Sequence, residues 1–80
     1  MAYYDQFLSF VSEIFEVEKE EITDDKTPDD LENWNSISHM DLMARFEDTF
    51  GIELDVEDIT EMDSIGAMKG ILKDQYGVDL

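Results

Sequence analysis

Ser36 and His39 are the two side chains whose types and spacing could support nucleophilic chemistry. Residues three positions apart lie on the same face of a helix, so the imidazole could reach the hydroxyl. A hydrolytic site also needs an orienting carboxylate and donors for a developing oxyanion, and no nucleophile elbow or oxyanion loop accompanies this pair. We therefore expect no catalytic residues in this chain. His39, the only histidine, is interpreted as a partly exposed side chain at the mouth of a helical bundle.

The acidic segment 55–63 is the second place where chemistry can be sought, because clustered carboxylates bind calcium. It lacks the central glycine and the alternating oxygen ligands of an EF-hand loop. The sequence also has no His-Glu zinc motif and no glycine loop that could cradle phosphates. We expect no specific metal site. A small calcium buffer is an open alternative, which tight binding of calcium at one site would identify.

Ser36 is then a candidate for attachment of a group rather than for catalysis. It stands at the start of an acidic amphipathic segment, where either Asn35 or Ser36 can cap a helix. A phosphate ester at this position would meet free backbone N–H groups and the positive end of the helix dipole. By spacing and composition alone, Ser36 could equally be a helix cap without a further role.

Acidic side chains dominate the composition, with 22 against five basic ones and a formal net charge of -17. This charge argues against binding to nucleic acid or to an anionic membrane, and it predicts partners with basic surfaces. Hydrophobic residues make up 42% of the chain, which is enough for a folded core. There is no cysteine, no apolar run of about 20 residues and no signal-peptide pattern after Met1. We expect a cytoplasmic protein without membrane insertion.

Hydrophobic spacing predicts the elements that position Ser36. A first helix of about four turns should fade near Val17, before a long charged connection over residues 18–30 that breaks at Thr27-Pro28. The apolar stripe of this helix consists of Tyr3, Phe7, Phe10, Val11 and Ile14. Three apolar side chains are expected to pin the connection to the bundle: Ile22, Leu31 and Trp34.

Three further helices follow in the sequence. The second stops at Gly51, a short third one has Asp55 as its N-cap with Asp58 three residues on, and the last runs from about Ser64 to Gly77. Core positions are Leu42, Met43, Phe46 and Phe50 in the second helix, and Ile65, Met68, Leu72 and Tyr76 in the last. The pattern predicts an all-α fold: a small four-helix bundle of three main helices and one short helix, with a long first loop, as a single domain over residues 1–80.

Residues 31–42, Leu-Glu-Asn-Trp-Asn-Ser-Ile-Ser-His-Met-Asp-Leu, resemble the attachment region of the acyl carrier protein family, whose motif reads Asp-Ser-Leu at the start of its second helix. Residues 46–54 are similar to the end of that helix, and residues 22–25 to the family's first loop. Asn35 and Ile37 stand where the family usually has aspartate and leucine. Aligning residues 40–42 with the family's apolar-acidic-leucine triplet places Ser36, and not Ser38, at the modified position.

The resemblance implies a discrete acyl (or aminoacyl) carrier protein that is not an enzyme. Ser36 would hold phosphopantetheine, transferred from coenzyme A by a phosphopantetheinyl transferase, and the arm would carry pathway intermediates as thioesters. The expected partners are this transferase and the acyl- or aminoacyl-loading ligases, synthases or transferases of specialised lipid, polyketide or related biosynthesis, each with a basic docking surface. The carrier itself is expected to be a monomer.

The second helix is expected to dock these partners through its exposed side. The acidic residues there are Asp41, Glu47 and Asp48, and Met40 and Ala44 add a small apolar contact. The resemblance assigns this surface to partner recognition. An alternative from another class is an unmodified acidic adaptor that occupies basic surfaces of a partner, which the net charge supports equally well.

Overall fold

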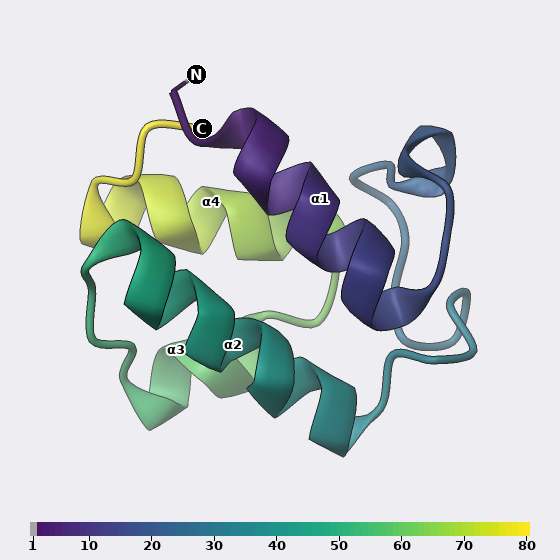
Figure 1. Ribbon diagram of the computed structural model, residues 1–80. Helices are drawn as coiled ribbons and strands as arrows, with labels where there is room; N and C mark the ends of the chain where they lie inside the picture. Colours follow the sequence, from purple (N-terminus) through teal and green to yellow (C-terminus); the bar gives the residue numbers. More distant parts are fainter. Residues whose placement is uncertain (1) are drawn as a thin grey trace.

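The computed structural model describes residues 2–80, and within them the fold consists of four α-helices and one short 3-10 helix, without a strand. The helices are α1 (Tyr4–Phe15), the 3-10 helix (Lys19–Glu21), α2 (Ser36–Phe50), α3 (Val56–Glu61) and α4 (Ile65–Tyr76). Figure 1 shows the two termini side by side, where the N–H of Tyr3 donates to the carbonyl of Asp79 at 2.9 Å. The predicted all-α bundle with a long first loop is confirmed; the 3-10 helix was not predicted.

The ends of the helices follow local sequence rules. Gly51 and Gly77 adopt the left-handed conformation, with φ of 66° and 65°, and end α2 and α4 as predicted. Ser64 caps α4, because its hydroxyl accepts the N–H of Ala67 at 3.0 Å. α1 is shorter than the four turns expected and ends at Phe15, because Glu16 turns left-handed with φ of 56°.

One apolar cluster forms the core of the bundle. Its fully buried side chains include Phe7, Val11 and Phe15 of α1, Leu42, Met43 and Phe46 of α2, and Ile65, Met68 and Leu72 of α4. Phe7 stacks on Phe46 with their ring centroids 5.5 Å apart. In α1 the predicted stripe was partly wrong: Tyr3 precedes the helix and is 37% exposed, whereas the unpredicted Phe15 is fully buried.

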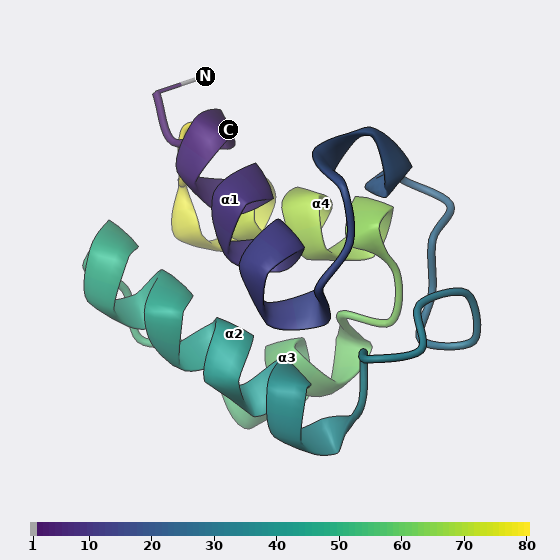
Figure 2. The ribbon, with the colours of Figure 1, turned by 45° about the vertical axis from the view of Figure 1, so that its right-hand side comes forward.

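The long first loop is pinned to the bundle as predicted, with Ile22, Leu31 and Trp34 buried. Two of its carbonyls, those of Asp24 and Lys26, accept the first free N–H groups of α4, each at 2.9 Å. Gly66 permits this approach, because a Cβ atom there would lie 3.1 Å from the Asp24 carbonyl oxygen. An ion pair of 2.6 Å between Lys69 and Asp24 adds to the contact. The loop therefore has a defined path to α2 (Figure 2).

The start of α3 differs from the prediction. Asp55 precedes the helix, but its side chain makes no capping hydrogen bond. Instead, its N–H donates to the hydroxyl of Tyr76 at 2.9 Å, and that hydroxyl donates to Asp58 at 2.5 Å. The Asp55 N–H lowers the pKa of Tyr76, but the hydrogen bond to Asp58, partial burial and the nearby carboxylates outweigh it and raise the pKa. α3 is thus held by α4 rather than by a cap of its own.

Candidate attachment site at Ser36

Ser36 is the first residue of α2 and is exposed to solvent. The segment that leads to it is anchored to the end of α1. Trp34 is only 4% exposed and stacks on Phe15 at 4.9 Å between centroids, and the side-chain amide of Asn33 donates to the carbonyl of Phe15 at 3.2 Å. These contacts fix the position from which Ser36 projects.

A reciprocal capping box begins α2. Of the two predicted caps, Asn35 is the one used: its Oδ1 accepts the N–H groups of Ile37 and Ser38, both at 3.0 Å. The hydroxyl of Ser38 in turn accepts the N–H of Asn35 at 2.9 Å and donates to the carbonyl of Asn33 at 2.6 Å. The hydroxyl of Ser36 has no such partner among residues 2–80. Of the two serines, Ser38 is engaged in structure and Ser36 is available for modification.

This box corrects one sequence-based expectation. The N–H groups of Ile37 and Ser38 are not free for a phosphate on Ser36, because Asn35 already binds them. The positive end of the helix dipole remains, and the first turn of α2 contains no acidic residue that would repel a phosphate. Asn35 caps the helix as an aspartate would, but its amide carries no negative charge that would repel a phosphate. The local residues therefore fit a phosphodiester on Ser36.

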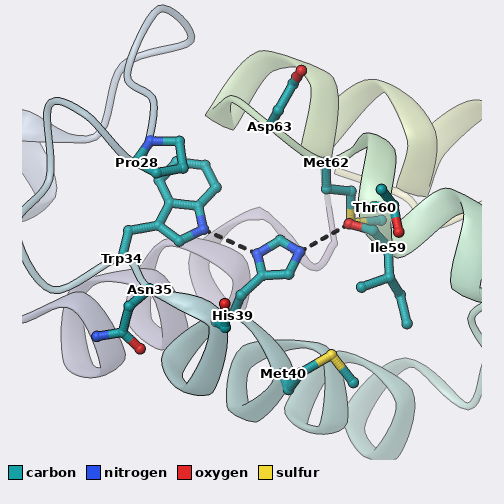
Figure 3. A pocket seen from close by; sticks show the side chains of 10 residues that line it. Pro28, Trp34, Asn35, His39, Met40, Ile59, Thr60, Met62 and Asp63 are labelled. Atoms are coloured by element: carbon teal, nitrogen blue, oxygen red, sulfur yellow. Dashed lines mark hydrogen bonds between the residues drawn. The ribbon is translucent and has the colours of Figure 1, made fainter.

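A depression of about 440 Å³ adjoins Ser36, between the start of α2, α3 and the segment before α2 (Figure 3). Its lining is mixed. Apolar surface comes from Pro28, Trp34, Met40, Ile59 and Met62, and polar surface from Asn35, Ser36, His39, Thr60 and Asp63. A flexible arm attached at Ser36 could place part of its length or its cargo here.

His39 bridges the elements around this depression. Its Nδ1 accepts the indole N–H of Trp34 at 3.0 Å, and its Nε2 lies 2.9 Å from the backbone oxygen of Ile59 (Figure 3). Because an indole N–H only donates, Nδ1 must be the acceptor, so Nε2 carries the proton and donates to Ile59. His39 is half-buried, as the sequence predicted, but the bridge itself was not predicted. Both ring nitrogens are engaged with partners other than Ser36.

The residues proposed for docking all lie on α2, and all but one of them are exposed. Asp41, Ala44 and Asp48 are exposed, and Met40 is 54% exposed. Glu47 was expected to face solvent, but it is half-buried and its carboxylate accepts the N–H of Leu54 at 2.8 Å. It therefore ties the chain that follows α2 back to the helix.

Sequence reasoning missed one member of the exposed surface. Ile37, directly after Ser36, is 84% exposed. Its position where the family usually has leucine was noted, but spacing assigned it no face.

The family model for the phosphopantetheine attachment site matches residues 5–72. The chain therefore belongs to the family of phosphopantetheine-bearing carrier domains, and the resemblance to acyl carrier proteins is confirmed. Its covalent cofactor is phosphopantetheine, as the resemblance implied. Domains of this family are carriers without catalytic activity of their own. No curated protein matches the chain.

Two further features concern the described part of the chain. No helix within residues 2–80 is both long and apolar enough to cross a membrane. In the same residues, no three or more His, Cys, Asp or Glu side chains are grouped as metal ligands would be.

Proposed function

We propose that this chain is a cytoplasmic carrier that holds phosphopantetheine on Ser36 and shuttles acyl or aminoacyl intermediates between the enzymes of a specialised lipid, polyketide or related biosynthetic pathway. One observation supports Ser36 above all. Its hydroxyl is exposed and without a partner among residues 2–80, whereas the neighbouring Ser38 hydroxyl makes hydrogen bonds on both sides.

Loading of the arm is a transfer to this hydroxyl. The Oγ atom of Ser36 attacks the β-phosphorus of coenzyme A, an Oγ–P bond forms, and the P–O bond to the adenosine bisphosphate leaving group breaks. The transferase accepts the hydroxyl proton. Asn35 and Trp34 contribute position, because the cap and the buried indole hold the start of α2 while the transferase docks. The arm then supplies a thiol that forms thioesters at raised local concentration.

Docking is proposed for the stripe of exposed residues that runs along α2 from Ser36. Asp41, Ala44 and Asp48 recur at helical spacing with Met40 beside them, and Ile37 extends the stripe to the attachment point. The acidic members would attract basic partner surfaces, and the small apolar members would make the contact. Glu47 was also predicted as a docking residue, but its carboxylate accepts the N–H of Leu54. A substitution of Glu47 would therefore change the structure as well as docking.

Incubation with coenzyme A and a broad-specificity phosphopantetheinyl transferase tests the attachment. Intact-mass measurement should show the addition of one arm to the wild type and to Ser38→Ala, and none to Ser36→Ala. Circular dichroism of each variant confirms that it is folded. Addition that persists in Ser36→Ala overturns the assignment. If the wild type reacts slowly with one transferase, Asn35→Asp should raise the rate, because it restores the residue that the family usually carries.

A further inference from the structure

The seam between α2 and α3 is closed directly beside Ser36 by the bridge of Trp34, His39 and Ile59. The base of this bridge is fixed, since Trp34 is buried against Phe15. The imidazole and indole planes lie 16° from parallel, and a hydrogen bond joins the edges of the two rings. At the far end the acceptor is the backbone oxygen of Ile59, so the bridge reaches the main chain of α3.

Behind the bridge the bundle is filled. Seven side chains beneath α2 and α3 are at most 2% exposed, namely Leu42, Met43, Phe46, Met62, Ile65, Met68 and Leu72. An alkyl chain entering between α2 and α3 would have to separate His39 from Ile59 and displace close-packed side chains. The separation would also leave the imidazole N–H and a backbone carbonyl without their partners, which is unfavourable away from water.

In front of the bridge, the depression of about 440 Å³ is lined by both apolar and polar residues, unlike the apolar core behind it. Met40 and Ile59 present apolar surface, Thr60 lies beside Ile59, and Asp63 lies farther along, beyond Met62 (Figure 3). The Thr60 hydroxyl donates to the carbonyl of Val56 at 3.0 Å, so its lone pairs remain to accept a hydrogen bond, and the Asp63 carboxylate is exposed. A hydroxyl or ammonium group at the end of a short chain complements these acceptors.

We propose that the bridge restricts this carrier to short thioester cargo whose far end donates hydrogen bonds, held in the surface depression and not inside the bundle. The proposal rests on attachment at Ser36 as argued above, and it makes His39 a positioning residue that determines cargo length. Hydroxyacyl and aminoacyl groups share the required chemistry.

Loading Ser36 with different cargoes tests the proposal. Coenzyme A thioesters of butyryl, hydroxybutyryl, β-alanyl and octanoyl groups would be attached by a broad-specificity transferase, with the mass of each product measured. The hydroxybutyryl and β-alanyl forms of the wild type should show higher melting midpoints than the butyryl form, because only they bind the depression through hydrogen bonds. Their amide NMR shifts should change at Met40 and Thr60. The two polar cargoes together distinguish hydroxyl from ammonium.

The octanoyl form tests the bridge. In the wild type it should leave the methyl NMR signals of Met43 and Met68 unchanged and should not raise the melting midpoint. In His39→Ala the same cargo should shift these signals and raise the midpoint by several degrees. Trp34→Phe removes the indole N–H but keeps a ring against Phe15, and should respond in the same direction to a smaller degree. Gln75→Ala, on the exposed side of α4, is the matched control and should behave as the wild type.

The outcomes separate the two proposals. An equal response of wild type and His39→Ala to the octanoyl group overturns the role of the bridge. Polar cargo that stabilises no more than butyryl overturns the role of the depression. A wild-type protein that gains no mass at Ser36 overturns the proposed function, and this inference with it.

Discussion

The two helices that flank the depression, α2 and α3, are held in different ways. α2 has 15 residues, a side-chain cap from Asn35 and three buried core residues. α3 has six residues, no side-chain cap and no buried residue. Its position depends on side chains from elsewhere, His39 of α2 and Tyr76 of α4. The proposed attachment residue, Ser36, therefore stands on the helix that is fixed by its own sequence, and the opposite wall of the depression is the helix that depends on its neighbours.

The two helices should differ most in the loss of stability when a core side chain of each is truncated. Phe46 of α2 is fully buried between two aromatic rings, Phe7 and Phe50, so Phe46→Ala should lower the free energy of unfolding by about 3–5 kcal/mol. Ile59 of α3 is only partly buried, so Ile59→Ala should cost clearly less. Urea unfolding followed by circular dichroism measures both. Equal losses would show that α3 contributes as much to the core as α2.

Charge reversal on the two helices should separate docking from general electrostatics. The double variant Asp41→Lys with Asp48→Lys should slow transfer of the arm severalfold at low salt, because complementary charge acts mainly on the encounter rate. The double variant Glu57→Lys with Glu61→Lys changes the net charge equally and serves as the control. The rate of the α3 variant divided by that of the α2 variant should fall towards one as salt rises, because salt screens the charges. A slower rate for the α3 variant would move the docking surface to the segment 57–63.

Removal of the side chain that precedes each helix should give a smaller difference in stability. Asn35→Ala removes a side chain that accepts two backbone N–H groups, and should lower the free energy of unfolding by about 1 kcal/mol. Asp55→Ala removes no capping bond and should cost less than about 0.5 kcal/mol. Asn35→Asp is the matched control, since its carboxylate can accept the same N–H groups. A loss for Asp55→Ala as large as that for Asn35→Ala would contradict the contrast between the helices.

Features determined by local chemistry were predictable from the sequence. Gly51 and Gly77 end helices because few other residues tolerate a left-handed backbone, and Ser64 caps α4 because its hydroxyl reaches a free N–H. The burial of Trp34 was predictable, because a large apolar side chain in a charged loop is more stable against the core than in water. Ser36 was predicted as the attachment residue from its motif and stays a prediction, and its hydroxyl has no partner among residues 2–80.

Contacts with distant backbone groups were not predictable in the same way. The partner of His39 is the carbonyl of Ile59, and backbone carbonyls carry no residue-specific signal in a sequence. Asp55 satisfied the local rule for a cap, but the Tyr76 hydroxyl took its N–H and bound Asp58 instead. Glu47 had the spacing of a solvent-facing residue, yet the turn after α2 brings the N–H of Leu54 to its carboxylate.

The most direct test of attachment at Ser36 is the mass of the protein purified from its native host. We expect the intact mass to exceed that of the bare chain by one phosphopantetheine arm, with or without cargo, and fragmentation to place that mass on Ser36. A native protein with the mass of the bare chain, or with the arm on Ser38, would contradict the account.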